Sequence, residues 1–142
     1  MEKFNFNLFP ELSTERLILR QPTPRDSKAI YLLRSNKKIN ELISRKMPQS
    51  ISETTKFIAE LNKRFKDKKN IFWVIVSKEH NQVIGTIGYQ NFKNNFSYAM
   101  GLFTMLCIPK IPLCGGFIIG VDNMEPKTPP LVMVKYFLSY FF

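Results

Sequence analysis

The chain has 142 residues and a mass of 16.6 kDa, which is the size of one domain and gives no reason to expect a second. Its composition, 44% hydrophobic and 13% aromatic, is that of a globular protein, and its net charge of +10 would attract acidic partners such as phosphates, nucleic acid or anionic membranes. Its two cysteines, Cys107 and Cys114, have no histidine or further cysteine at metal-ligand spacing, which argues against a disulfide framework or a metal site.

The first predicted elements are a strand and a helix. Residues 15–21 alternate with a period of two and place two leucines on one face, as in a strand that buries one side. Thr23, Pro24 and Asp26 follow as an N-cap, a first helical residue and the returning carboxylate of a capping box. A helix is therefore predicted to start at Thr23 or Pro24, and to bend or restart after residues 35–36.

The middle of the chain is predicted to form a second helix and a β-hairpin. Ser50 and Glu53 have the spacing of another capping box, so the helix should begin there. Its apolar face would consist of Phe57, Ile58, Leu61 and Phe65. Residues 71–77 and 83–92 are rich in β-branched and aromatic residues and flank a polar turn, which predicts a hairpin with a five-residue connection. The predicted order is strand, helix, helix, strand, strand.

The last fifty residues differ in composition from the rest. They contain five of the nine prolines and only two carboxylates, Asp122 and Glu125. The uncharged stretch at residues 98–108 is too short to span a bilayer, and its extension to residue 121 crosses two prolines and a lysine, so we expect no membrane span. A fragment anchored to a membrane by residues 98–121 is a weaker alternative. The N-terminal residues lack the apolar stretch of a secretory signal, and we expect a cytoplasmic protein.

Three stretches together carry a resemblance to a known family. They are LSTERLILR at residues 12–20 with the helix start that follows, SISETTKFI at residues 50–58, and FWVIVSKEHNQVIGTIGYQNF at residues 72–92. In combination they resemble the GNAT acetyltransferases of the RimJ/RimL type, which acetylate amino groups with acetyl-CoA. We expect residues 9–92 to be the GNAT-like N-terminal portion, and residues 93–142 to be a divergent apolar tail of the same single domain.

The resemblance implies a fold and an activity. The fold would be α/β (α+β), with a mixed, mostly antiparallel sheet flanked by helices and acetyl-CoA held where the fourth and fifth strands splay apart. The acceptor would be an amino group of a protein, a peptide N-terminus or a small amine. In the family a loop of the form Gln/Arg-x-x-Gly-x-Gly/Ala opens a helix after the fourth strand, and its backbone N–H groups bind the pyrophosphate. Attack by a neutral amine also needs a proton acceptor and donors facing the carbonyl oxygen. The sequence identifies neither the catalytic base nor the oligomeric state.

The glycine loop of the family is not recognisable after residue 92. The nearest candidate is PLCGGFIIG at residues 112–120, where Gly115 and Gly116 would be the cofactor-binding residues, but the Gln/Arg and a polar helix start are missing. Paired glycines more often form a turn. We therefore predict an acetyltransferase that is impaired as written, with weak or no acetyl-CoA binding. A truncated or degenerated paralogue, or a reading-frame slip between residues 91 and 100, would give this pattern.

Four residues are candidates for substrate binding, namely Trp73, Tyr89, Asn91 and Glu41. The resemblance places Trp73 near the substrate groove, although an aromatic residue within a strand more often packs in the core. Tyr89 and Asn91 close the third strand, where they could touch substrate or cofactor or be ordinary surface. Glu41, like Glu53, could attract a cationic amine or be an exposed helix carboxylate with no special role.

A cationic cluster gives an alternative to catalysis. It lies at the end of the second predicted helix and consists of Lys63, Arg64, Lys66, Lys68 and Lys69. The helix macrodipole favours cations at this end, which explains a merely solvated face. The cluster could instead bind an acidic peptide, the 3′-phosphate of CoA or RNA, so the alternative function is a non-catalytic basic module that binds RNA or a protein partner. His80, in the hairpin turn, has no evident carboxylate partner and is interpreted as a solvated side chain rather than a base.

Overall fold

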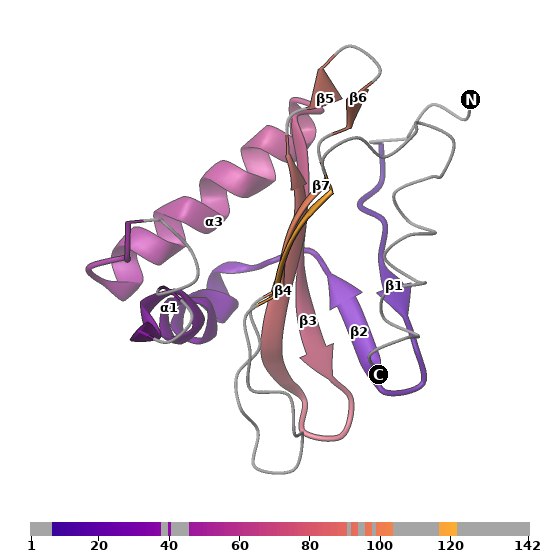
Figure 1. The fold of residues 1–142 in the computed structure, drawn as a ribbon. Helices are drawn as coiled ribbons and strands as arrows, with labels where there is room; N and C mark the ends of the chain where they lie inside the picture. Colours follow the sequence, from indigo (N-terminus) through magenta and orange to yellow (C-terminus); the bar gives the residue numbers. More distant parts are fainter. Residues whose placement is uncertain are drawn as a thin grey trace.

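A computed structural model of the chain describes residues 7–37, 40, 46–90, 92–93, 96–97, 99–103 and 117–121. Its centre is a four-stranded antiparallel sheet in the order β1-β2-β3-β4 (Figure 1). The strands are β1 Leu12–Ser13, β2 Leu17–Arg20, β3 Asn70–Ser77 and β4 Gln82–Gln90. The strand predicted at residues 15–21 is confirmed as the shorter β2, and the two-residue β1 was not predicted.

The helices lie together on one face of this sheet (Figure 1). A 3-10 turn, η1 Pro24–Asp26, leads into α1 Ser27–Ser35, and α3 spans Ile51–Lys66. Thr23 is the N-cap of η1, as predicted, and α1 ends before Asn36, where a bend or restart was predicted. None of the described helices is long and apolar enough to cross a membrane.

The predicted capping box of α3 forms with one difference in its partner. The Ser50 hydroxyl accepts the Glu53 N–H at 3.1 Å, as the spacing predicts. The Glu53 carboxylate accepts the N–H of Gln49 at 2.7 Å, one residue before the cap. One free N–H group of the first turn, that of Glu53, and the N–H group of Gln49 just before the cap are therefore satisfied locally. These two hydrogen bonds fix where the helix begins.

The hairpin of β3 and β4 is confirmed, but its limits differ from the prediction. Gln82 pairs with Ser77, so the connection is residues 78–81, and the left-handed backbone of Asn81 at φ 48° closes the turn. The second strand was predicted to run to residue 92 but ends at Gln90. Phe92–Lys93 instead forms β5, which pairs with β6 Phe96–Ser97.

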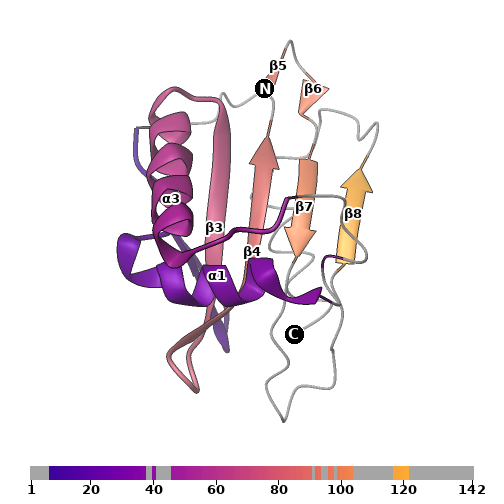
Figure 2. The same cartoon turned by 90° about the vertical axis from the view of Figure 1, so that its left-hand side faces the viewer.

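Two further strands lie beyond the hairpin. β7 Ala99–Phe103 and β8 Phe117–Val121 pair antiparallel over five residues each, from Ala99 opposite Val121 to Phe103 opposite Phe117. β7 lies beside β4, and β8 lies on the side of β7 that faces away from β4 (Figure 2). The architecture is a mixed α/β fold with an antiparallel sheet and helices on one face, which confirms the predicted fold class.

The core is formed where β3 is covered on both faces. Every residue of β3 is buried. On the helical side, Val74 and Val76 cluster with Ile30 of α1 and Ile58 of α3. On the opposite side, the indole of Trp73 lies in edge contact with Phe9, with ring centroids 6.0 Å apart. The long apolar run of β3 is therefore explained by its central position.

Candidate functional site

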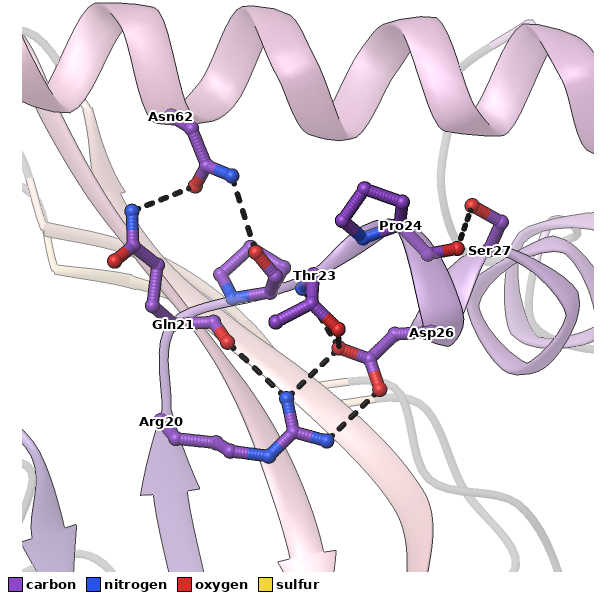
Figure 3. Close-up of polar contacts among 8 residues, drawn as sticks. Arg20, Gln21, Thr23, Pro24, Asp26, Ser27 and Asn62 are labelled. Carbon is purple, nitrogen blue, oxygen red and sulfur yellow. Dashed lines mark hydrogen bonds and ion pairs between the residues drawn. The ribbon is translucent and has the colours of Figure 1, made fainter.

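A polar cluster joins the end of β2 to the start of α1 (Figure 3). The Arg20 guanidinium donates two hydrogen bonds of 2.8 Å to the two carboxylate oxygens of Asp26, and one of 3.1 Å to the carbonyl of Gln21. The same carboxylate accepts the Thr23 N–H at 2.8 Å and the Thr23 hydroxyl at 3.1 Å. Since Asp26 is only 6% exposed, its charge is balanced almost entirely by these partners.

The electrostatics of the pair follow from this geometry. Burial acts to raise the pKa of Asp26, but the hydrogen bonds from Arg20 and Thr23 together outweigh it, and the pKa lies below the ordinary carboxyl value. The hydrogen bond to Asp26 raises the pKa of Arg20, against an opposing effect of burial. Both groups are therefore charged at neutral pH and hold one another in place.

Neighbouring contacts extend the cluster to α3. The Gln21 amide donates to the Asn62 side-chain oxygen at 3.0 Å, and the Asn62 amide donates to the carbonyl of Pro22 at 3.1 Å (Figure 3). Farther along the two helices, the Thr55 hydroxyl donates to the Ser27 hydroxyl at 2.8 Å. The two helices are thus fixed to β2 and to each other by side chains.

A second set of contacts connects the helical layer to β4. The Arg34 guanidinium lies 4.1 Å from the ring centroid of Phe57, and Phe57 meets the ring of Phe72 edge-on at 6.0 Å. Phe72 in turn lies against Gly88 of β4, where an added Cβ would be only 2.8 Å from its ring. We call these four residues the Arg34–Gly88 ladder. It runs from α1 across α3 to the strand pair, where α1 crosses the face of the sheet (Figure 2).

Comparisons with known proteins identify the family. The family model described as "Acetyltransferase (GNAT) domain" matches residues 16–106, which is more than half of the chain and includes β2, both helices, the hairpin and β7. The chain belongs to the GNAT acetyltransferase family. The match continues to residue 106, past the end of the hairpin.

Individual relatives agree with this assignment. An uncharacterized N-acetyltransferase of Bacillus subtilis, YoaA, is 34% identical over 82 residues, which are 58% of this chain and 46% of that protein. The chain thus matches about half the length of this curated relative. Among solved structures, RimL, a ribosomal protein acetyltransferase solved with coenzyme A, has a TM-score of 0.53 at 19% identity, over 64% of this chain and 53% of RimL. A probable acetyltransferase has a TM-score of 0.56 at 13% identity, over 91% and 64% of the two chains. At these identities the two structures show a shared fold.

Only part of the predicted substrate site of this GNAT chain lies in the described residues. Trp73 is fully buried, and its indole N–H donates to the carbonyl of Pro10 at 2.6 Å. Its ring therefore packs in the core, and in this structure it offers no surface to a substrate. Tyr89 lies on β4 opposite Ile71. Asn91 and Glu41 lie outside the described residues, as do the proposed cofactor residues Gly115 and Gly116.

The other singled-out side chains lie on the surface. His80 is in the hairpin turn, as predicted, but it has a carboxylate neighbour that the sequence analysis did not recognise, because Glu79 lies 3.7 Å from its Nε2. Glu79 is itself largely exposed, so it does not orient the imidazole as a buried partner would. The cationic cluster lies at the C-terminal end of α3. The relatives named above give no support to the alternative of an RNA- or protein-binding module.

The described residues do not supply a cradle for the pyrophosphate of acetyl-CoA. A free helix N-terminus is the feature that binds such an anion. Asp26 is the N-cap of α1, and the first turn of α3 contains Glu53. Both N-termini thus carry a carboxylate of the chain itself, whose negative charge disfavours a second anion there. Within the same residues, no group of three or more His, Cys, Asp or Glu side chains is placed to hold a metal ion.

Sequence reasoning missed the Arg34–Gly88 ladder. The sequence alone assigns no role to Arg34 and places Phe57 on the apolar face of the second helix. The available signal was that both lie on helices whose apolar faces turn toward the same strand pair. Which helix positions meet depends on how α1 and α3 cross, and periodicity alone does not give that angle.

Proposed function

We propose that the chain provides the acceptor-side part of an acetyl-CoA-dependent N-acetyltransferase of the RimJ/RimL type. It would serve the transfer of an acetyl group to an amino group of a protein, a peptide N-terminus or a small amine. The observation that carries this proposal is the family match over residues 16–106, which includes the helical layer and the hairpin described above. The N-acetyltransferase from Bacillus subtilis and the ribosomal protein acetyltransferase RimL support an amine as the acceptor.

The described residues have a positioning role in this proposal. The Arg20–Asp26 pair and the Asn62 contacts fix α1 and α3 relative to β2. The Arg34–Gly88 ladder then sets the distance of the same helices from β4. A rigid layer of this kind holds an acceptor in one orientation, which is a large part of what an enzyme contributes to a two-substrate reaction.

We further propose that the chain binds acetyl-CoA weakly or not at all. Two observations support this. The β7 and β8 strands are paired in antiparallel register over five residues each, whereas the family is expected to hold the cofactor where two strands splay apart. In addition, the N-termini of α1 and α3 carry the chain's own carboxylates. Residues 93–142 would then be a divergent tail of the same domain.

Calorimetric titration with acetyl-CoA at modest salt tests this proposal. We expect a dissociation constant larger than micromolar, because the sequence after residue 92 lacks the Gln/Arg-x-x-Gly-x-Gly/Ala loop whose backbone N–H groups would bind the pyrophosphate. A micromolar or tighter constant would overturn the proposed impairment. In that case, the double substitution Gly115→Val and Gly116→Val should remove binding if these glycines form the cradle. The exposed control Glu60→Gln should leave the constant unchanged.

A further inference from the structure

Arg34 is a partly buried cation without a hydrogen-bonded partner among the described residues. Its guanidinium is covered on one side by the Phe57 ring at 4.1 Å. Burial lowers its pKa, and the charge of Glu53 opposes this only in part. Glu53 makes no ion pair with Arg34 in the described part of the chain, and its carboxylate accepts the N–H of Gln49 at 2.7 Å. Among the described residues, no acceptor therefore binds the five N–H donors of the Arg34 side chain.

Arg20 has a structural role in the same layer, and its surroundings differ from those of Arg34. Arg20 is also partly buried, and it has a bidentate carboxylate partner in Asp26, at 2.8 Å for both hydrogen bonds. The pKa of Arg20 is raised as a result, while the pKa of Arg34 is lowered. The two arginines thus have opposite surroundings within one layer of the molecule. A desolvated guanidinium is costly unless an anion or a ring compensates it. At Arg34 the compensation from the described residues is the Phe57 ring and, in part, the charge of Glu53.

We propose that the Arg34 guanidinium, held on Phe57, is a subsite that binds an oxyanion, a carboxylate or a phosphate, carried by the acetyl acceptor. The assignment of this anion to the acetyl acceptor rests on the proposed function, whereas the binding of an oxyanion at Arg34 does not. The planar fork of a guanidinium matches both groups with two parallel hydrogen bonds. The ring restricts rotation of the guanidinium and excludes water from one face. The side chain therefore loses little conformational entropy when the anion binds.

The position of Arg34 agrees with such a role. It lies in the last turn of α1, in the helical layer that crosses the face of the sheet at β4 (Figure 2). The macrodipole of α1 favours a cation at this end, and the Phe57 ring attracts a cation placed over it, which would explain a long basic side chain here. Neither effect requires the planar fork of a guanidinium, since a lysine would also serve both. The stacked guanidinium is what points to an oxyanion.

A direct binding experiment tests the subsite without any need for catalysis. The arginine side-chain N–H signals of the full chain would be followed by NMR during titration with inorganic phosphate and, separately, with succinate. We expect a saturable shift of the Arg34 signal, and no such site in Arg34→Gln. Arg25→Gln removes an exposed arginine of η1 with the same charge change, and it should bind as the parent chain does. Saturation by only one of the two anions identifies the group that the site takes.

Three outcomes would overturn the proposal. They are an Arg34 signal that neither anion shifts, binding that survives in Arg34→Gln, and equal loss of binding in Arg25→Gln, which would indicate attraction by net charge alone. Arg34→Lys keeps the charge but loses the planar fork of the guanidinium. It should bind the anion about tenfold more weakly, or weaker still, as expected when one of two charged hydrogen bonds is lost. Unfolding curves of each variant check that a loss of binding is not a loss of folding.

An acetylation assay then connects the subsite to the acceptor. Two peptides would be compared that differ only in an aspartate or an asparagine beside the N-terminal residue. We expect Arg34→Gln to lower kcat/KM for the acidic peptide by about tenfold to a hundredfold, and to leave the neutral peptide unchanged. An equal loss for both peptides would contradict acceptor recognition. A chain without any transferase activity would agree with the proposed loss of acetyl-CoA binding, and the NMR titration would then decide the anion site by itself.

Discussion

The guanidinium of Arg20 and the carboxylate of Asp26 form two parallel hydrogen bonds of 2.8 Å, and this pair connects the last residue of β2 to the turn that opens α1. Asp26 is almost fully buried, while Arg20 remains partly exposed. Removing one partner leaves the other charge poorly solvated, and it also releases the start of the helix. The stability of the helical layer should therefore depend strongly on either residue.

Asp26→Asn should lower the free energy of unfolding by about 1 to 3 kcal/mol, because the neutral amide cannot balance the Arg20 charge or accept both of its N–H groups. Urea unfolding followed by the fluorescence of Trp73, the single tryptophan, measures the change. Glu60→Gln removes an exposed carboxylate of α3 and serves as the control. Equal effects of the two substitutions would contradict a special role of the pair.

The same pair predicts a pH dependence with a definite sign. The pKa of Asp26 lies below its ordinary value of 3.8, although burial opposes this, because Arg20 and Thr23 donate hydrogen bonds to the charged form. Its contribution to stability is therefore fully present above pH 3.8 and is lost as the pH falls through the lower pKa of the folded state. The stability difference between the parent chain and Asp26→Asn should shrink on going from about pH 6 to about pH 2. A difference that stays constant over that range would show that the carboxylate is not the group responsible.

Gly88→Ala tests the contact between the ladder and β4. The new Cβ would lie 2.8 Å from Cδ2 of Phe72 and 3.2 Å from the carbonyl oxygen of Ile71, so the ring or the strand must move. We expect a loss of about 1 to 3 kcal/mol in the free energy of unfolding, measured by urea. Adding Phe72→Leu to Gly88→Ala should recover part of this loss. The explanation fails if the double variant is less stable by the full sum of the two single effects.

Asn70 gives a prediction of the opposite sign. It is 1% exposed, and neither its side-chain nitrogen nor its side-chain oxygen has a hydrogen-bond partner in the part of the chain that the structure describes. A buried, unpaired amide costs free energy, so Asn70→Val should raise the free energy of unfolding, by about 1 kcal/mol or more. The exposed control is Lys69→Gln. A clear destabilisation by Asn70→Val would mean that the amide has a polar partner in solution, such as a bound water.

The parts of the fold that the sequence predicted are those fixed by short-range contacts. Thr23 with Asp26, and Ser50 with Glu53, meet within one helical turn, so their spacing alone located both helix starts. The limits of β4 depend instead on pairing with a distant strand, and the apolar run up to residue 92 extended past the last pair, Asn70 with Gln90. The two-residue β1 exists because Leu12 pairs with Leu19, and two residues have no period to detect.

The candidate site was harder to predict for the same reason. An aromatic residue in a strand more often packs in the core than contacts a substrate, but the sequence alone allows both. The contacts of Trp73 with Phe9 and Pro10 favour the core. Arg34 and Phe57 come from two helices, and their contact depends on the crossing of α1 over α3. No local pattern encodes that crossing, so the ladder follows from packing rather than from spacing.

Trp73→Phe distinguishes these two interpretations of the tryptophan. The substitution removes the indole N–H that donates to the Pro10 carbonyl at 2.6 Å and leaves a cavity beside Phe9. We expect the free energy of unfolding, followed by circular dichroism, to fall by about 1 to 3 kcal/mol, and hydrogen exchange to accelerate in β1, which begins two residues after Pro10. The Arg34 signal should respond to phosphate and succinate as in the parent chain, because Trp73 lies on the opposite face of β3 from the helices. Loss of anion binding without loss of stability would instead return Trp73 to the substrate site.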